Sequence, residues 1–244
     1  NLLGALSGGI AAAYLLIPML GLWNAIVAVA ILLLVLSQLA VFYASPGWMR
    51  RFGVVLVPAW VAVLLFANPT QYSSQKLLPG ERLLYLDEGK EAAISVVEDS
   101  NQVRWLKSNN TYRLGATTAI RGEKRLGHLP LLLHPSPKNV AFIGVATGVS
   151  VSAGIDHNLT ELVGVEILPG VLNALSYFED HNRNLLAHDN VTAILDDGRI
   201  YLRSTDRRFD VIVADLFIPW HAGNGSLYTR EHYEASRQRL SAQG

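Results

Sequence analysis

The sequence predicts an α/β domain with a parallel sheet, preceded by apolar helices that span a membrane. The first observation behind this prediction is that residues 1–67 contain no Asp or Glu and only two basic residues, Arg50 and Arg51. The second is that, from Asn139 onward, short apolar runs alternate with helix-like segments. Such alternation is typical of parallel strands joined by right-handed crossovers. A small antiparallel β segment is expected between these two regions.

Composition excludes several classes of protein. The 244 residues are 50% hydrophobic and 16% charged, which is apolar for a soluble protein. Two of the 20 basic residues precede residue 68. The part of the chain after residue 67 therefore contains 18 basic and all 20 acidic residues, and its net charge is close to zero. A nucleic-acid-binding domain would carry a basic excess, so this class is excluded. The absence of cysteine excludes disulfides and thiolate metal sites.

Three apolar segments precede the α/β part. Segments 2–20 and 25–44 have roughly the length needed to cross about 30 Å of hydrocarbon, and segment 52–67 is somewhat shorter. Pro18 is expected to kink the first helix, and residues 21–24 are expected to form a turn before the second. A buried hairpin of a soluble all-α core is the alternative, but such cores rarely lack charge for so long. We therefore expect about three transmembrane helices.

A linker and a β segment are predicted to follow. Residues 68–80 contain prolines together with several Ser and Gln residues, which is typical of a linker. Residues 81–120 are predicted to form the antiparallel β segment, with two strands around a turn at 87–90 and a third strand over 102–107. So small a sheet has little core of its own. We therefore expect it to pack on the next domain as a lid or wall.

Residues 121–244 are predicted to form the parallel α/β domain. A helix over 121–133 comes first, and prolines stop it before the first strand. The strands are expected at 139–144, 161–166, 191–195 and 209–215. The helices that connect and follow them are expected at 149–158, 170–181 and 229–240. The chain begins inside an apolar run and stops at a helix-ending glycine, so both ends are expected to be cuts, with at least one further strand after Gly244.

Four residues stand at the carboxyl ends of the four predicted strands, where ligands of such sheets bind. Gly144, with Gly148 after it, allows the backbone to approach a ligand. Glu166 can accept hydrogen bonds from both hydroxyls of a ribose. Asp197 can accept from the exocyclic amine of adenine, and Asp215 is left to face the reactive end.

Each of these residues also has an ordinary structural explanation. A glycine pair after a strand is weak support for nucleotide binding, and an acid at a strand end often caps the next helix. The Asp197–Gly198 pair alone would be an ordinary turn. The coincidence at four strand ends is what predicts a nucleoside site.

Five segments carry a family resemblance: 129–135 (LPLLLHP), 165–171 (VEILPGV), 195–202 (LDDGRIYL), 209–215 (FDVIVAD) and 226–233 (SLYTREHY). On these segments the chain resembles, from about Leu84 to Gly244, the spermidine synthase (aminopropyltransferase) family. It is most similar to the branch in which transmembrane helices precede the synthase-like domain. Residues 1–44 are also similar to the last helices of that branch's membrane domain.

The resemblance implies a Rossmann-like, methyltransferase-type fold with an N-terminal β segment. It also implies a ligand of the S-adenosylmethionine class, either decarboxylated or intact, and no metal, because a sulfonium is already a good leaving group. Glu166 would match the family's ribose-binding acid, Asp197 its adenine-binding acid, and Asp215 the catalytic aspartate that helps to deprotonate the attacking amine. The full set of expected ligand-binding residues is Gly144, Val145, Ala146, Gly148, Glu166, Ile167, Asp197 and Gly198.

The chain departs from the family pattern on the acceptor side. Thr147 stands where the family usually has an aspartate that holds the aminopropyl amine. Residues 216–220 lack a second acid, the usual glutamine is replaced near Arg113, and the usual tyrosine is replaced within 122–125. A site for a dicationic diamine should be rich in carboxylates. The residues that match the family's nucleoside-binding positions are therefore present, whereas those that match its polyamine-binding positions are largely replaced.

We predict a membrane-anchored transferase that moves an aminopropyl or related alkyl group to a small-molecule amine, with Asp215 as the proton acceptor. Two alternatives stay open: methyl transfer from intact S-adenosylmethionine, and a non-catalytic sensor that couples ligand binding to the membrane helices. His128, Trp220 and His221 are candidates for shaping the acceptor pocket, and each is equally well explained by packing or surface position.

The expected partners are an amine and the lipid bilayer, with a homodimer left open. Arg50 and Arg51 favour a cytoplasmic loop, which would place the C-terminal domain outside if segment 52–67 spans the membrane. Because an adenosyl ligand is cytosolic, we instead expect the catalytic domain in the cytoplasm and the protein in the inner or plasma membrane.

Overall fold

The structure is a computed structural model that describes residues 2–44, 58–63, 75–110, 112–214 and 224–244. Contacts within the chain divide it into two units, which are described separately. The first unit holds Asn1–Lys76 with Glu88–Ala93, and the second holds Leu77–Asp87 with Ile94–Gly244.

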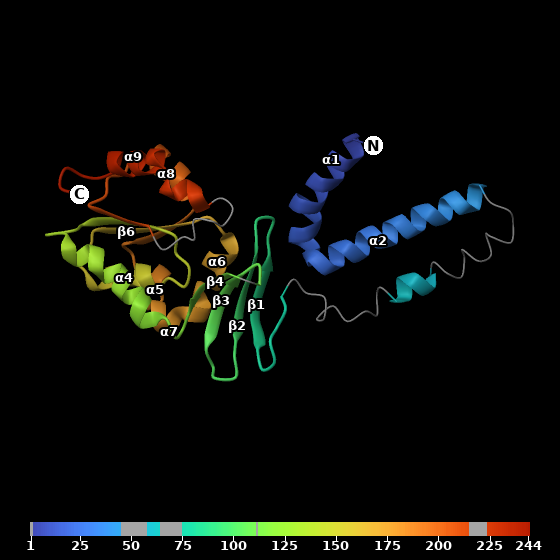
Figure 1. Cartoon of the computed structure of the whole chain (residues 1–244), viewed down its shortest axis with the longest axis horizontal. Coiled ribbons are helices and arrows are strands. Elements are labelled where there is room, and N and C mark those ends of the chain that lie inside the picture. The colour runs from blue at the N-terminus through green and yellow to red at the C-terminus, as the bar shows by residue number, and fades with distance from the viewer. Residues whose placement is uncertain (1, 45–57, 64–74, 111, 215–223) are drawn as a thin grey trace. The chain divides into compact units, whose positions relative to one another are not determined.

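The N-terminal unit is built from apolar helices: α1 (Leu2–Ala11), a π-helical turn η1 (Ala12–Leu16) and α2 (Ile17–Ala44) (Figure 1). Within the described residues, one candidate membrane span is found, Leu2–Ala40, with a mean hydropathy of 2.6. Its backbone breaks at Gly21, where φ is 76° and ψ is 164°, and not at Pro18. The wide turn η1 comes just before Pro18 and accommodates its ring and missing N–H. Of the predicted third segment, only residues 58–63 are described, and they are helical.

The predicted β segment is a four-stranded sheet in the order β1-β2-β3-β4. Its strands are β1 (Arg82–Glu88), β2 (Ala93–Glu98), β3 (Arg104–Ser108) and β4 (Tyr112–Ala116). The three predicted strands are confirmed, although β3 starts two residues late because Gln102 has a φ of 64°. Sequence reasoning did not assign β4, which follows a turn in which Asn109 and Asn110 both have positive φ.

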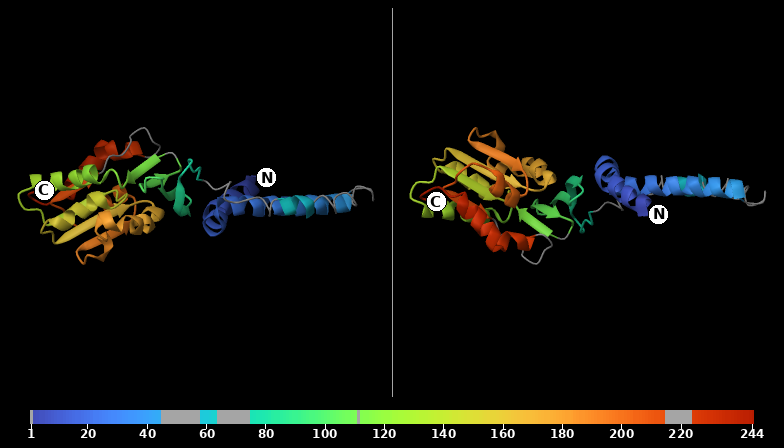
Figure 2. Two further views of the ribbon diagram at one scale, coloured as in Figure 1. Left: turned by 90° about the horizontal axis from the view of Figure 1, so that it is seen from below. Right: turned by 90° about the horizontal axis from the view of Figure 1, so that it is seen from above.

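The second sheet is parallel, in the order β7-β6-β5-β8 (Figure 2). Its strands are β5 (Asn139–Ile143), β6 (Glu161–Glu166), β7 (Val191–Leu195) and β8 (Val211–Ala214). The predicted strands are therefore confirmed, with β8 shorter than expected. Phe209 lies before β8 and forms an isolated parallel bridge with Leu240.

The helices of this unit agree less well with the prediction. Two of them match: α4 (Ile120–Leu133) and α9 (Arg230–Gln238). The helix expected at 149–158 is one α-helical turn followed by a 3-10 turn, α5 (Val149–Ser152) and η3 (Ala153–Asp156). The helix expected at 170–181 is divided into α6 (Pro169–Ala174), η4 (Leu175–Phe178) and α7 (Glu179–Asn182). Three further elements were not predicted: η5 (Leu185–Ala187), α8 (Gly198–Ser204) and η6 (Asn224–Tyr228).

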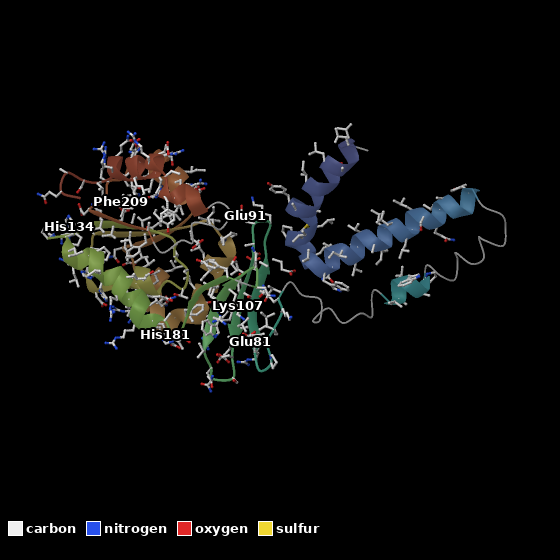
Figure 3. The ribbon with its side chains drawn as sticks, viewed as in Figure 1. Glu81, Glu91, Lys107, His134, His181 and Phe209 are labelled. Carbon is white, nitrogen blue, oxygen red and sulfur yellow. The ribbon has the colours of Figure 1, made fainter. Side chains whose placement is uncertain are left out.

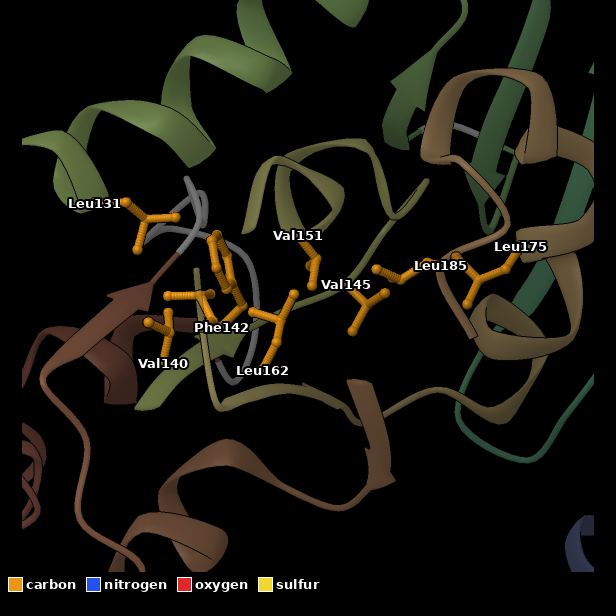
Figure 4. Packing of buried hydrophobic residues seen from close by; sticks show 9 residues of the cluster. Leu131, Val140, Phe142, Val145, Val151, Leu162, Leu175 and Leu185 are labelled. Atoms are coloured by element: carbon orange, nitrogen blue, oxygen red, sulfur yellow. The ribbon is translucent and has the colours of Figure 1, made fainter. Parts of the chain in front are cut away.

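The core lies on both faces of the parallel sheet, because alternate residues of each strand point to opposite sides. On one face, Val140 and Phe142 pack with Leu131 of α4 and Val151 of α5 (Figure 4). On the other face, Ala141, Ile143, Val163 and Val165 pack with Leu202 of α8. Burial on both faces explains why these strands are continuous apolar runs in the sequence.

Candidate functional site

The turn after β5 has the backbone conformation that its glycines predict. Gly144 and Gly148 have φ values of 95° and 78°, which a residue with a side chain rarely adopts. Ala146 also has a positive φ, of 48°, at a cost of about 1–2 kcal/mol. The Gly144 N–H donates to the Val165 carbonyl at 2.8 Å, which joins the turn to the neighbouring strand. We call residues 144–148 the glycine loop.

Glu166, at the end of β6, holds this loop in place. Its side chain is buried, and Oε2 accepts hydrogen bonds from the N–H groups of Val145 at 3.1 Å and Ala146 at 3.4 Å. Oε1 accepts from the N–H groups of Ile167 at 2.9 Å and Leu168 at 3.1 Å. Four donors occupy the roughly four acceptor positions of a carboxylate. The residue predicted to bind ribose therefore also ties β6 to the glycine loop, a role that the sequence did not indicate.

Asp197, at the end of β7, caps helix α8. Its Oδ1 accepts from the Arg199 backbone N–H at 2.8 Å, and its Oδ2 accepts from Arg199 Nη2 at 2.5 Å. These hydrogen bonds to Arg199 lower the pKa of Asp197 below its ordinary value. Arg199 was missed in the sequence, although an arginine two residues after a helix-capping aspartate is a local signal.

The carboxyl ends of β5, β6 and β7 are joined to one another. The Asp196 N–H donates to the Glu166 carbonyl at 3.1 Å, next to Asp197. A Cβ at Gly198 would lie 2.4 Å from Ile143 Cγ2, so α8 starts in close contact with the end of β5. The structure thus brings all eight predicted ligand-binding residues to one edge of the sheet.

Two partners of Thr147 at this edge, Glu123 and Asn182, were missed by sequence reasoning. Thr147 of the glycine loop is buried, and its hydroxyl donates to Glu123 Oε2 of α4 at 2.5 Å. The Thr147 carbonyl accepts from Asn182 Nδ2 at 3.0 Å. Glu123 and Asn182 lie 24 and 35 residues from Thr147 in the sequence, and neither contact has a local signal.

His128 does not belong to this edge. Its Nδ1 lies 3.1 Å from Nε2 of His157, which follows η3, whereas the glycine loop precedes α5 at the other end of the same helical segment. Burial lowers the pKa of His157, and the nearby His128 lowers it further. Three other candidates, Asp215, Trp220 and His221, lie outside the described residues.

Comparison with known proteins agrees with the resemblance seen in the sequence. The spermine/spermidine synthase domain matches residues 121–244. A polyamine aminopropyltransferase of Leptospira interrogans is 25% identical over 79% of this chain and 39% of its own length. One of Oceanobacillus iheyensis is 23% identical over 99% of this chain and 49% of its own length. The chain thus spans less than half the length of these relatives.

Solved structures show the same fold. A spermidine synthase in complex with the transition-state analogue AdoDATO has a TM-score of 0.60 and 22% identity, over 66% of this chain and 55% of its own. The predicted methyltransferase-type fold with its N-terminal β segment is confirmed by this likeness. Because the family match covers residues 121–244, about half of the sequence, the chain belongs to the spermine/spermidine synthase domain family.

Proposed function

We propose that this chain is the membrane-anchored, nucleoside-binding part of an aminopropyltransferase. Its ligand is the adenosyl sulfonium decarboxylated S-adenosylmethionine, and its acceptor is a small-molecule amine. The names of the two polyamine aminopropyltransferase relatives and the AdoDATO complex of the structural neighbour support this reaction class.

The observation that carries the proposal is the order of polar groups along the sheet edge. The order β7-β6-β5 presents Asp197, Glu166 and the glycine loop in that sequence. Neighbouring strands lie about 4.8 Å apart, so three adjacent ends span roughly 10 Å. This length suits an extended nucleoside, with adenine at Asp197, ribose at Glu166 and the sulfonium beyond.

The contacts within the site indicate what ligand binding must change. Ribose hydroxyls need acceptor positions on Glu166, and the Ala146 N–H, at 3.4 Å, makes its longest hydrogen bond. We therefore propose that a ribose hydroxyl first replaces the Ala146 N–H as a hydrogen-bond donor to Glu166. Asp197 keeps its charge because of Arg199, and a charged carboxylate is the stronger acceptor for an adenine amine.

Asp215, the residue after β8, is proposed as the proton acceptor. The neutral amine attacks the carbon bonded to the sulfonium, a carbon–nitrogen bond forms and the carbon–sulfur bond breaks. The thioether methylthioadenosine leaves, and the proton of the attacking amine passes to Asp215. General-base help of this kind contributes about 10²–10⁴ in rate.

The N-terminal unit supports the membrane part of the proposal. At about 1.5 Å per residue, the apolar stretch Leu2–Ala40 is roughly 58 Å long, about twice the hydrocarbon thickness. The break at Gly21 divides it into two pieces of spanning length. We therefore propose two spans here and a third in 52–67, a linker over 68–80, a β segment over 81–120 and a cytoplasmic nucleoside-binding domain over 121–244.

Product analysis tests the reaction. The full-length protein in lipid nanodiscs is incubated with a mixed amine pool and either decarboxylated or intact S-adenosylmethionine, and the products are identified by mass spectrometry. The expected result is an amine enlarged by one aminopropyl group, together with methylthioadenosine, from the decarboxylated ligand only. A methylated product from the intact ligand would contradict the proposal and favour a methyltransferase.

Calorimetry with methylthioadenosine tests the nucleoside site separately. Asp197→Ala is expected to abolish binding, whereas Asp215→Asn should bind normally and form product about 10²–10⁴-fold more slowly. Unchanged affinity in Asp197→Ala would show that the adenine site is elsewhere.

A further inference from the structure

Strand β4, helix α4 and the glycine loop meet at one point beside the proposed nucleoside site. A Cβ at Gly115 of β4 would lie 2.6 Å from Thr147 Cγ2 and 2.9 Å from Glu123 Oε1. The absence of a side chain at residue 115 therefore allows the carboxylate of Glu123 to reach the loop. All three residues belong to the same unit.

The carboxylate of Glu123 is held in a fixed position at this point. The Thr147 hydroxyl donates to its Oε2 at 2.5 Å, which is short for a hydrogen bond from a hydroxyl to a carboxylate. Thr147 is itself fixed, since its side chain is buried and its carbonyl accepts from Asn182. Glu123 lies in the first turn of α4, where the helix dipole favours a negative charge.

The position of Glu123 relative to the sheet decides which part of the ligand it can meet. In the proposed binding mode, adenine lies at the end of β7 and ribose at the end of β6. The alkyl chain on sulfur then lies at the end of β5, the next strand in the sheet. Thr147 belongs to the loop that follows β5, so the Glu123 carboxylate lies on this side of the ribose. The alkyl chain of decarboxylated S-adenosylmethionine ends in an ammonium group, which is the natural partner of a carboxylate.

We infer that Glu123 binds this terminal ammonium and selects the decarboxylated ligand over the intact one. The intact ligand carries a carboxylate on the carbon that bears the amine, and Glu123 repels that negative charge. Thr147 acts as a positioning residue, because its hydroxyl orients the Glu123 carboxylate. This inference rests on the proposed function, since it assigns a residue to one end of the proposed ligand.

Glu123→Gln tests the inference, because it removes the charge and keeps the size of the side chain. Calorimetry on the full chain compares decarboxylated S-adenosylmethionine, the intact ligand and methylthioadenosine, which has no ammonium. The loss of one hydrogen bond to a charged group should weaken binding of the decarboxylated ligand about tenfold or more. Methylthioadenosine should bind to Glu123→Gln within about twofold of the original affinity. The ratio of the affinity for decarboxylated S-adenosylmethionine to the affinity for the intact ligand should become smaller.

Two other variants sharpen the test. Thr147→Val removes the hydroxyl that orients Glu123. It should lower the affinity for the decarboxylated ligand by less than Glu123→Gln does, and the loss should again be confined to that ligand. Glu161→Gln is the matched control. Glu161 is the first residue of β6, at the end of the strand opposite to the proposed site, and it pairs with Arg207. It should leave all three affinities unchanged.

The outcomes separate this inference from the proposed function. Unchanged affinity for the decarboxylated ligand in Glu123→Gln would overturn the inference, while binding of methylthioadenosine by the unmodified chain would leave the proposed nucleoside site intact. Equal losses of affinity for all three ligands in Glu123→Gln would indicate a structural role for Glu123 and would also overturn the inference. Failure of the unmodified chain to bind any adenosyl ligand would instead contradict the proposed function.

Discussion

Glu166 Oε2 accepts a hydrogen bond from the Val145 N–H at 3.1 Å, and one buried carboxylate thereby holds two strand ends together. In Glu166→Gln, one of the two oxygens becomes an NH2 group that faces backbone N–H donors. Leaving buried donors without an acceptor costs about 1–3 kcal/mol, so we expect a loss of this size in the free energy of unfolding. Urea denaturation of the full chain in detergent measures it.

The control is on the same strand. Glu161 pairs with Arg207 at 2.9 Å, and both side chains are partly exposed. Glu161→Gln should change the free energy of unfolding by less than about 1 kcal/mol. Equal losses in the two variants would contradict the role given to Glu166.

Helix α4 offers a second matched pair of variants. A Cβ at Gly127 would lie 2.1 Å from the Ser150 carbonyl oxygen and 2.6 Å from the Ala153 Cβ, and neither backbone can move away without separating α4 from α5. Gly127→Ala should therefore lower the free energy of unfolding by at least about 1–3 kcal/mol. Gly122→Ala, on the same helix, meets no atom within 4 Å and should be neutral or stabilising by up to about 1 kcal/mol. Thermal unfolding of both variants checks the contrast, and a stable Gly127→Ala would show that the helices are not so closely packed.

A buried ion pair between Glu81, which precedes β1, and Lys107 of β3 gives a third prediction. Lys107 Nζ lies 2.7 Å from Glu81 Oε1, and the two side chains are 6% and 7% exposed (Figure 3). Burial alone would raise the pKa of Glu81, but the Leu78 N–H and Lys107 hold that pKa below its ordinary value. Lys107→Met leaves a buried carboxylate unpaired and should cost about 3–5 kcal/mol in urea denaturation.

Two further variants test this explanation. The double substitution Lys107→Met with Glu81→Leu should recover most of the lost stability, because no charge is then left unpaired. Arg230→Met breaks an exposed pair with Glu234 and should cost less than about 0.5 kcal/mol. A double variant as unstable as Lys107→Met would show that packing, and not charge, causes the loss.

The pair of His128 and His157 predicts how stability depends on pH. The folded-state pKa of His157 is lowered by burial and by His128, so the unfolded chain binds a proton more readily near its ordinary pKa of about 6.5. Stability contributed by neutral His157 is fully present above about pH 6.5 and is lost as pH falls below it. His157→Gln should make unfolding less dependent on pH between about pH 6.5 and 5, with pH 8 as the reference. A variant with the same pH dependence as the original chain would assign the effect to another group.

The sequence predicted the strands of the parallel sheet better than its helices. β5, β6 and β7 are apolar runs rich in β-branched residues and bounded by polar ones, and this local pattern sets their ends. The segment after Gly148 is different, since Val, Ser and Gly residues have weak helix propensity and packing against α4, α7 and the sheet shapes it. Helix α8 was missed because Asp197–Gly198 also fits an ordinary turn, and the aspartate was not assigned as the N-cap of a helix.

The candidate site divides in the same way. The acids Glu166 and Asp197 could be found because they follow strands, and strand ends are readable in a sequence. Their partners could not, because the donors to Glu166 include N–H groups 20 and 21 residues away. The contact of Thr147 with Glu123 depends on α4 packing beside the glycine loop, which no local pattern indicates.

The bridge between Phe209 and Leu240 has a consequence for handling the protein. β8 is hydrogen-bonded to β5 on one side, and on its other side the described residues supply only this single bridge. Where no segment covers the other side of Val211–Ala214, its unpaired N–H and C=O groups are a template for pairing with another chain. In a preparation that leaves this side of β8 uncovered, pairing between molecules is therefore an expected route to precipitation even when the core beneath it is intact.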